Sequence, residues 1–314
     1  MFKTIGVVGA GTMGHGIAET FAMHRYDVRL FDTNDDVLRG ASAAIRAELE
    51  LLAEEDYIAV DTIDATLARI TLCGDLRDTV AHCDFVIEAA PEKIDLKRAL
   101  FAELDRYCQP DAVFASNTSS LALATMIETL PPHRQARTMV CHWYNPAHLM
   151  PIVELSFFGN MPRALYDEVA ALHAVIGKVT VKVLKDVPGL VANRIQQGVA
   201  REVFSIIEQG IAEPEDVDKA LKFGPAFRYA TTGQLEVADF GGLDIWCVVG
   251  DNLLKVIDNR QEANPLLREK VSQGKLGLKS GEGFFKYPAD RIPDIRRKFM
   301  RKLIHQLKAS EFYK

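Results

Sequence analysis

The stretch TIGVVGAGTMGHGIA, residues 4 to 18, decides the fold of this 314-residue chain. It places Gly9, Gly11 and Gly14 in G-x-G-x-x-G spacing, after a short β-branched run and before a run of helical composition. In that context the first glycine permits a tight turn, the second lets a phosphate approach the backbone, and the third lets helix and strand pack closely. The stretch therefore predicts a strand, a phosphate-binding turn and a helix whose N-terminus faces a dinucleotide.

Asp32 strengthens this prediction, because it closes the second apolar run and stands eighteen residues after Gly14. A carboxylate at that place can accept hydrogen bonds from the ribose hydroxyls and repels a 2'-phosphate. No Arg or Lys follows it until Arg39. We expect NAD rather than NADP as cofactor, with Thr12 and Met13 of the turn beside it. The alternative is a glycine turn in which Asp32 serves only as a turn or cap residue.

Short β-branched runs alternate with helical stretches along the first part of the chain. The expected strands are TIGVVGAG, DVRLFD, RITLCG, DFVIEAA, AVFASNTSS, RTMVCHW, IVELSF and KVTVKVLKD, and the expected helices cover 12–24, a long segment from 35, 94–107 and 162–176. This alternation predicts an α/β fold of Rossmann type, with a doubly wound, mainly parallel sheet.

One connection is too short for a parallel crossover. RTMVCHW and IVELSF are separated by about eight residues, including Pro146 and Pro151, whereas a crossover needs a dozen or more. We expect two antiparallel neighbouring strands, which bring His142 back toward Glu154.

A break follows at Pro188 and Gly189, and the remaining pattern is helical over 190–211, 214–223 and 243–258. We place the domain boundary near Asp186. The expected domains are a NAD-binding Rossmann-like domain over residues 1–185 and a C-terminal all-helical domain over residues 186–314.

Composition and charge argue against several kinds of partner. The formal net charge is -6, which does not favour nucleic acid or an anionic membrane surface, and no apolar run approaches the roughly 20 residues of a membrane span. The five scattered cysteines form no C-x-x-C, and His133 and His148 show no ligand spacing and are expected to be solvated. We expect a cytoplasmic protein without a metal.

His142 and Glu154 suit the oxidation of an alcohol by NAD. The reaction needs a base for the hydroxyl proton, and histidine titrates near neutral pH. A neighbouring carboxylate orients the imidazole and stabilises the imidazolium. From the hairpin alone, a buried ion pair without a catalytic role and an exposed polar couple remain open as alternatives. Cys141 is not expected to take part, because successive residues on a strand point to opposite faces.

Six motifs occur in an order and at separations that resemble the L-3-hydroxyacyl-CoA dehydrogenase family along nearly the whole chain: GAGTMGHGIA, VIEAAPE, ASNTSSL, HWYNP with PIVEL, DVPGLVANR and SGEGFFKY. The resemblance implies that His142 and Glu154 are the catalytic pair. It also implies that Ser119 and Asn193 hydrogen-bond the reacting oxygen and the histidine, a task that suits a hydroxyl and an amide. Without the resemblance, Asn193 could be merely a residue at a helix N-terminus.

The same resemblance assigns further positions. It implies that Asn145 helps to shape the substrate site, that Asn117 lies at the cofactor, and that Glu92 and Lys97 reach the nicotinamide half of NAD. For Glu92 and Lys97 the alternative is a pair of exposed charges at the start of a helix. The resemblance also implies a homodimer formed by the helical domain and a place in fatty acid metabolism.

Two segments depart from the acyl-CoA members. Residues 47–68 contain seven acidic side chains and no Lys or Arg, which is a poor surface for the phosphates of coenzyme A. Residues 222–244, KFGPAFRYATTGQLEVADFGGLD, contain an insertion that looks more like the branch acting on free hydroxy acids, such as L-gulonate 3-dehydrogenase and carnitine dehydrogenase. Arg228 in this insertion could pair with a substrate carboxylate. The alternative is an arginine that is exposed or paired with Glu236 or Asp239.

Three functions are therefore open. The first is an NAD-dependent dehydrogenase that interconverts L-3-hydroxyacyl-CoA and 3-ketoacyl-CoA. The second has the same fold and chemistry but acts on a small free hydroxy acid. The third is an NAD-binding protein without activity, which the set of His142, Glu154, Ser119 and Asn193 disfavours.

Overall fold

The computed structural model describes residues 2–313, which form two compact units. The first unit extends to Val191 and includes Leu303–Lys308, and the second contains Ala192–Lys302 and the residues from Ala309 onward. Residues beyond the expected boundary near Asp186 belong to the first unit because the Val191 amide donates a hydrogen bond to Glu154 Oε1 (2.8 Å) inside it.

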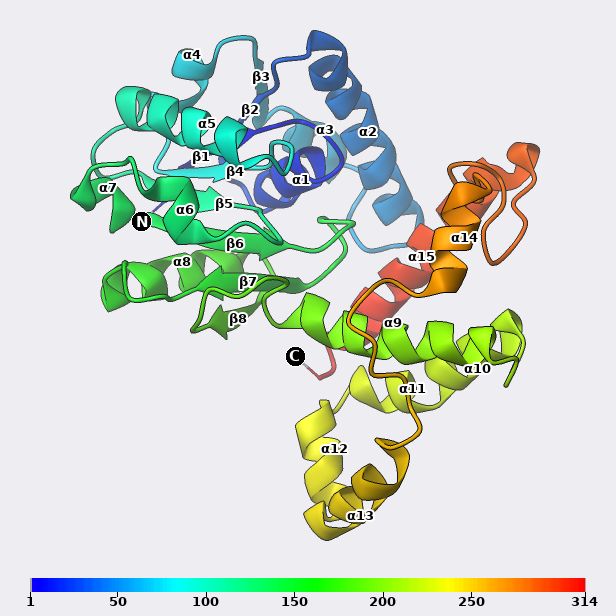
Figure 1. Ribbon diagram of the computed structural model, residues 1–314. Helices are drawn as coiled ribbons and strands as arrows, with labels where there is room; N and C mark the ends of the chain where they lie inside the picture. Colours follow the sequence, from blue (N-terminus) through cyan, green and yellow to red (C-terminus); the bar gives the residue numbers. More distant parts are fainter. Residues whose placement is uncertain (1, 314) are drawn as a thin grey trace. The chain divides into compact units, whose positions relative to one another are not determined.

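The first unit contains one mixed sheet (Figure 1). Its strands are β1 (Thr4–Val8), β2 (Asp27–Phe31), β3 (Ile70–Cys73), β4 (Phe85–Glu88), β5 (Val113–Ser116), β6 (Thr138–Trp143), β7 (Ile152–Ser156) and β8 (Val179–Val183). They lie in the order β3-β2-β1-β4-β5-β6-β7-β8. Every neighbouring pair is parallel except β6 and β7. The expected doubly wound α/β fold and the expected antiparallel pair are both confirmed.

The helices of this unit connect the strands. They are α1 (Gly14–Met23), α2 (Asp35–Glu54), α3 (Thr62–Leu67), α4 (Leu76–Val80), α5 (Ile94–Tyr107), α6 (Leu123–Ile127), α7 (Pro132–Gln135) and α8 (Arg163–Val175). The longer helices match the expected ranges. The short helices α3, α4, α6 and α7 have four to six residues each, too few to give a readable helical period.

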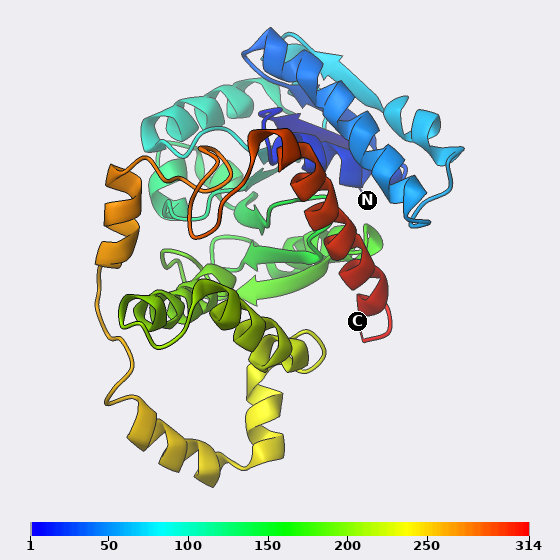
Figure 2. The same ribbon diagram turned by 90° about the vertical axis from the view of Figure 1, so that its right-hand side faces the viewer.

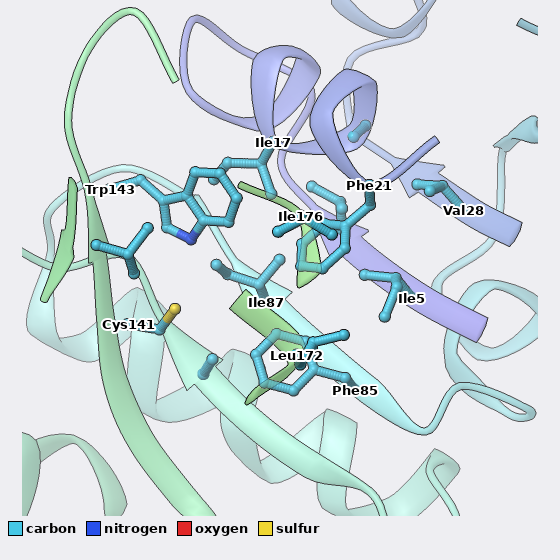
Figure 3. Close-up of a cluster of buried hydrophobic side chains, with 14 of the residues drawn as sticks. Ile5, Ile17, Phe21, Val28, Phe85, Ile87, Cys141, Trp143, Leu172 and Ile176 are labelled. Carbon is cyan, nitrogen blue, oxygen red and sulfur yellow. The ribbon is translucent and has the colours of Figure 1, made fainter. Parts of the chain in front are cut away.

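Each face of the sheet carries its own buried core. Successive residues of a strand point to opposite faces, so Phe85 and Ile87 of β4 pack with α1 and α8, whereas Val86 packs with α4, α5 and α6. Figure 3 shows the first of these cores, where Ile17 and Phe21 of α1 lie above Ile5, Ile87 and other strand residues. Helices on both faces of a parallel sheet explain why its inner strands are apolar throughout.

The glycine turn has the geometry that the motif predicts. Gly9 has a φ of +105°, and a Cβ added there would lie 2.6 Å from the carbonyl oxygen of Ala89. A Cβ on Gly14 would lie 1.6 Å from the carbonyl oxygen of Gly9, whereas a Cβ on Gly11 would meet nothing within 4 Å. Gly9 and Gly14 are thus needed for the turn itself, and the space at Gly11 is open to a ligand.

The second unit is built from helices. They are α9 (Ala192–Glu208), α10 (Pro214–Phe223), α11 (Pro225–Tyr229), α12 (Gln234–Gly241), α13 (Leu243–Leu253) and α14 (Pro265–Ser272), followed by the 3-10 turn η1 (Ala289–Arg291) and most of α15 (Ile292–Ser310). Figures 1 and 2 both show α12 and α13 extending away from α9 and α10. Although α13 is rich in apolar residues, none of them is buried. No helix of residues 2–313 is long and apolar enough to cross a membrane.

Candidate active site

Polar side chains gather where the strands of the first unit end. Asp32 follows β2, Glu88 closes β4, Ser116 closes β5, and His142 is the penultimate residue of β6. These strands are parallel, so their carboxyl ends meet at one edge of the sheet, which is where open α/β sheets bind their ligands. The glycine turn after β1 lies at the same edge.

Asp32 is held beside the glycine turn. Its Oδ2 accepts a hydrogen bond from the Ala10 amide (2.8 Å), and its Oδ1 accepts one from the Asn34 amide (2.9 Å). The carboxylate is only partly buried, Thr12 is exposed, and Met13 packs against the core. Asp32 therefore does act as a turn residue, as the alternative reading holds, and it also remains accessible to a ligand that enters the turn.

A buried ion pair lies next to this turn. Lys97 of α5 is 1% exposed, and its Nζ lies 2.7 Å from Glu88 Oε1 and 2.8 Å from Glu88 Oε2. The Ser116 hydroxyl donates to the same carboxylate (2.6 Å), as does the Ala90 amide. The alternative that Lys97 is an exposed charge at the start of a helix is therefore wrong.

Glu92 organises the segment after β5. Its Oε1 accepts hydrogen bonds from the Thr118 hydroxyl (2.6 Å), the Ser119 amide (3.1 Å), and the amide and hydroxyl of Ser120. Its Oε2 lies 3.2 Å from Lys97 Nζ. Partial burial alone raises the pKa of a carboxyl, but the Thr118 hydrogen bond and the Lys97 charge outweigh it and lower the pKa of Glu92 to about 2. The carboxylate thus fixes the backbone that presents Ser119.

His142 and Glu154 form a hydrogen-bonded pair across the antiparallel strands. They are direct register partners, and His142 Nδ1 lies 2.8 Å from Glu154 Oε2. Glu154 is fully buried, and its other oxygen accepts the Val191 amide. The expectation of an exposed polar couple is therefore excluded, whereas a catalytic pair and a structural ion pair both fit this contact.

The pairing decides which ring nitrogen of His142 can react. A carboxylate accepts hydrogen bonds, so Nδ1 carries the hydrogen, and Nε2 keeps its lone pair. Among residues 2–313, no hydrogen-bond partner of His142 Nε2 or of the Ser119 hydroxyl is found. Both groups are therefore available to a bound molecule. The Tyr144 ring lies edge-on to the imidazole of His142, with 5.2 Å between the two ring centroids. Burial raises the pKa of the Tyr144 hydroxyl to about 12.

Asn117 precedes β6 along the chain, and Asn145 lies between His142 and Glu154. Asn117 Oδ1 accepts the Trp143 amide (2.8 Å), which fixes the end of β6. Asn145 is exposed in the connection between β6 and β7.

Two of the expected site residues lie in the second unit. Asn193 is the second residue of α9, and Arg228 is an exposed residue of α11. Within the described chain, no ion pair joins Arg228 to Glu236 or Asp239. The roles of Asn193 and Arg228 in the site therefore remain predictions.

One expectation about the histidines is wrong. His148 is buried rather than solvated, and burial lowers its pKa to about 4. The reason is that the connection between β6 and β7 folds under α1, where a Cβ on Gly16 would lie 3.3 Å from the His148 amide. His133, in contrast, is exposed as expected.

Sequence reasoning missed Glu88, Ser116 and Thr118. The signal was present for Glu88 and Ser116, since each is a polar residue that closes an apolar strand at the carboxyl edge of a parallel sheet. Thr118 acts through Glu92, a contact between segments 26 positions apart that no local pattern indicates.

Comparison with known proteins places this site in a family. The model of the 3-hydroxyacyl-CoA dehydrogenase NAD-binding domain matches residues 4–187, and that of the 3-hydroxyacyl-CoA dehydrogenase C-terminal domain matches residues 189–287. The chain belongs to the 3-hydroxyacyl-CoA dehydrogenase family. As a member of this family, the chain is an NAD-dependent dehydrogenase. The resemblance that the sequence motifs indicated is therefore confirmed.

The chain is similar to one curated relative and two solved structures that act on different kinds of substrate, as their names state. It is 30% identical to a 5-formyl-3-hydroxy-2-methylpyridine 4-carboxylate 5-dehydrogenase of Mesorhizobium japonicum, over 97% of each chain. A crystal structure of an NAD+-dependent enzyme of that name matches with a TM-score of 0.90, 29% identity and 100% of both chains. The (S)-3-hydroxybutyryl-CoA dehydrogenase of Ralstonia eutropha matches with a TM-score of 0.74 and 30% identity, over 92% of this chain and 100% of its own.

Proposed function

We propose that this NAD-dependent dehydrogenase oxidises a small free acid that carries a hydroxyl or a hydrated aldehyde, with His142 as the base. NAD, when bound, supplies the acceptor for the hydride. The lone pair of His142 Nε2 takes the hydroxyl proton, and Glu154 stabilises the imidazolium that forms. In the reverse direction the same nitrogen returns the proton.

Ser119 and Asn193 are proposed to hold the reacting oxygen and the histidine. The Ser119 hydroxyl is supported in this role because its backbone is fixed by Glu92 while its side chain keeps its bonding capacity. Asn145 is proposed to shape the substrate end of the site.

The residues proposed to bind the cofactor lie at the carboxyl ends of the parallel strands. Gly9, Gly11 and Gly14 with Thr12 and Met13 form the turn for the pyrophosphate, and Asp32 accepts the ribose hydroxyls.

Glu92, Lys97 and Asn117 are proposed to serve the nicotinamide half. Lys97 acts there through Glu88 and Glu92, since both carboxylates hold its ammonium group, and these contacts fix the segment that contains Asn117.

The proposal of a free-acid substrate rests on one observation. The TM-score to the pyridine carboxylate dehydrogenase, 0.90 over the whole of both chains, exceeds the 0.74 to the acyl-CoA enzyme, although the sequence identities, 29% and 30%, are alike. The name of that relative describes a substrate with a free carboxylate and a formyl group. The surface of α2, α3 and the segment that joins them adds support, because it exposes Glu50, Glu54, Asp56, Asp61 and Asp64, of which Asp64 is paired with Arg46. Such a surface disfavours the phosphates of coenzyme A.

A second candidate is the oxidation of an L-3-hydroxyacyl-CoA, as part of fatty acid metabolism. It is favoured by the match of both halves of the chain to the 3-hydroxyacyl-CoA dehydrogenase models and by the 30% identity to a 3-hydroxybutyryl-CoA dehydrogenase. The two candidates share the base, the cofactor and the fold, and they differ in whether the substrate presents a carboxylate or a thioester.

The deciding experiment compares the two substrate classes on the purified protein. NADH oxidation is measured with acetoacetyl-CoA and with free keto acids, and NAD reduction with free hydroxy acids and pyridine aldehydes that carry a carboxylate. A kcat/KM above about 10⁵ M⁻¹s⁻¹ with acetoacetyl-CoA, together with no turnover in the free-acid panel, would reject the free-acid proposal.

Arg228→Met tests how the carboxylate is held. If Arg228 pairs with it, KM for the free acid should rise steeply while NAD affinity stays unchanged, because a carboxylate that loses a bidentate guanidinium is costly to enclose. Lys222→Met, which removes another exposed cation of the same unit, is the matched control and should leave KM as it is. Equal KM values in both variants would remove Arg228 from the site.

The remaining proposals concern assembly and location. We propose a homodimer, as the resemblance implies, and small molecules rather than nucleic acid or membranes as partners. The cysteines Cys73, Cys83, Cys108, Cys141 and Cys247 are all free, which supports the proposal of a reducing cytoplasmic location.

A further inference from the structure

Four ionisable side chains form a cluster beneath α1 that the proposed reaction does not use. They are Glu19 of α1, Glu48 of α2, His148 of the β6–β7 connection, and His15 of α1. His148 Nδ1 lies 3.9 Å from Glu19 Oε2 and 3.6 Å from Glu48 Oε2, and His15 Nε2 lies 3.2 Å from Glu48 Oε1. One ligand atom each from Glu19, Glu48 and His148 can be chosen so that all three lie within 4.8 Å of one another.

The inner atoms of this cluster have no hydrogen-bond partners. Glu19 is fully buried, and neither of its carboxylate oxygens has a hydrogen-bond donor among residues 2–313 as long as both glutamates are ionised. The neighbouring Glu48 can bond it only when one of the two carboxyl groups carries a proton. Glu48 Oε2 and His148 Nδ1 are buried and unpaired in the same part of the molecule. Four unpaired polar atoms at one place are exceptional, because buried polar groups in folded proteins nearly always find a partner.

The inner atoms of the cluster accept no hydrogen bond from the neighbouring cations, although the charge of Lys178 acts on Glu19. Lys178, at the start of β8, is buried nearby, but its Nζ donates to the carbonyl oxygens of Ala147 (2.7 Å) and Met150 (2.9 Å). His15 bonds the outer oxygen of Glu48 and, through Nδ1, the carbonyl oxygen of Gly11 (2.8 Å). The cluster therefore presents oxygen and nitrogen lone pairs toward a common centre.

We propose that Glu19, Glu48 and His148 bind a divalent transition metal ion, most suitably Zn²⁺. Two carboxylate oxygens and one imidazole nitrogen are ordinary zinc ligands, and the imidazole disfavours Mg²⁺ and Ca²⁺, which prefer oxygen alone. Two ligands at about 2.1 Å from a tetrahedral zinc ion lie about 3.4 Å apart. The separations of 3.6 and 3.9 Å from His148 Nδ1 to the two carboxylate oxygens exceed this by a few tenths of an ångström. Ligand atoms of the two glutamates lie within 4.8 Å of each other, so binding the ion requires side-chain rotations of the glutamates.

The proposed ion would connect two parts of the dehydrogenase site. His15 hydrogen-bonds the outer oxygen of Glu48, as outer-shell groups do for a ligating carboxylate, and it also bonds Gly11 in the glycine turn. His148 lies in the connection between the strands that carry His142 and Glu154. The ion would thus tie the cofactor turn to the catalytic hairpin and stabilise both.

The test begins with metal binding by the whole chain. Protein freed of metal by chelation is titrated with ZnCl₂ by calorimetry, and with CoCl₂ by visible absorption, since a tetrahedral Co²⁺ site gives characteristic d–d bands. We expect one ion per chain and a thermal transition that rises with zinc concentration, because a ligand that binds only the folded state stabilises it.

Variants assign the ion to this cluster. Glu19→Gln and His148→Gln should each lower zinc affinity by more than the roughly 10- to 100-fold typical of losing an outer-shell partner, and both should lose the cobalt bands. His15→Gln should weaken binding within that 10- to 100-fold range. Glu50→Gln, an exposed position on the same helix as Glu48, is the matched control and should bind like the wild type.

Two outcomes would overturn the proposal. If the wild type binds no zinc and Glu19→Gln melts at the wild-type temperature, Glu19 is simply protonated and shares its hydrogen with Glu48. If zinc binds equally to Glu19→Gln, His148→Gln and Glu50→Gln, the ion occupies surface histidines. Because Gln is isosteric with a protonated Glu, the first variant should fold, and the cobalt spectrum of His148→Gln provides an independent reading.

Discussion

The hydrogen bond between His142 and Glu154 makes the two imidazole nitrogens unequal. Nδ1 is committed to a fully buried carboxylate whose second oxygen is held by the Val191 amide. Nε2 is left as the one nitrogen that can exchange a proton with a substrate. The geometry thus separates two tasks, orientation and proton transfer, between the two sides of one ring.

His142→Gln should lower kcat by roughly 10²- to 10⁴-fold, the usual range for losing general acid-base catalysis. NAD affinity, measured by fluorescence titration, should barely change, because the glycine turn and Asp32 are untouched. His133→Gln, at an exposed histidine, is the control and should keep full activity. A His142→Gln enzyme with more than half of the wild-type kcat would reject the assignment.

Glu154→Gln should lower kcat, because a neutral amide no longer stabilises the imidazolium that forms when His142 takes the hydroxyl proton. The free energy of unfolding is measured beside kcat, so that a loss of activity is not mistaken for a loss of folded protein. A variant with the wild-type kcat would argue that Glu154 only supports the fold.

Lys97→Met should destabilise the protein by about 3–5 kcal/mol, because it leaves the buried Glu88 carboxylate without its cation. The free energy of unfolding is measured by urea denaturation. Lys93→Met, at an exposed lysine four positions earlier, should change it by no more than about 0.5 kcal/mol. Adding Glu88→Gln to Lys97→Met should recover part of the loss, and a double variant no better than the single one would mean that the pair is not the cause.

The strands and helices could be predicted where the local pattern is strong. The alternation of apolar runs and helices predicted the sheet, and the short connection before β7 predicted its antiparallel pairing, because a crossover helix does not fit there. The pairing of His142 with Glu154 follows from that hairpin, but their register does not. It depends on which residues of β6 and β7 the two cores accept.

The parts that could not be predicted depend on contacts between distant elements. Glu19 lies in α1 between Ala18 and Phe21, and a helical pattern does not tell whether such a glutamate points outward. Only the packing of α2 and the β6–β7 connection buries it. For the same reason the sequence could not show that Lys97 is buried, since its partner Glu88 is the last residue of β4, a different element of the chain. Burial of a charged residue is a property of the assembled fold, not of its own helix.

The two units differ in how many of their apolar side chains are buried. The first buries them on both faces of the sheet. In the second, α13 carries Ile245, Trp246, Val248 and Val249, and none of the described residues of this helix is buried. Proteins that act as monomers rarely expose apolar patches of this kind. A surface of this composition is typical of a protein–protein interface.

We expect the second copy of the chain to cover this surface, as the resemblance implies. Light scattering after gel filtration should then give twice the 34.9 kDa of one chain. Phe240→Asp should shift the protein toward the monomer, because Phe240 of α12 is 82% exposed, and a charge there opposes burial in an interface. Glu236→Gln, on the same helix and also exposed, should leave the dimer intact. A wild-type protein that stays monomeric at all concentrations would refute the dimer, and the apolar surface of α12 and α13 would then need a different partner.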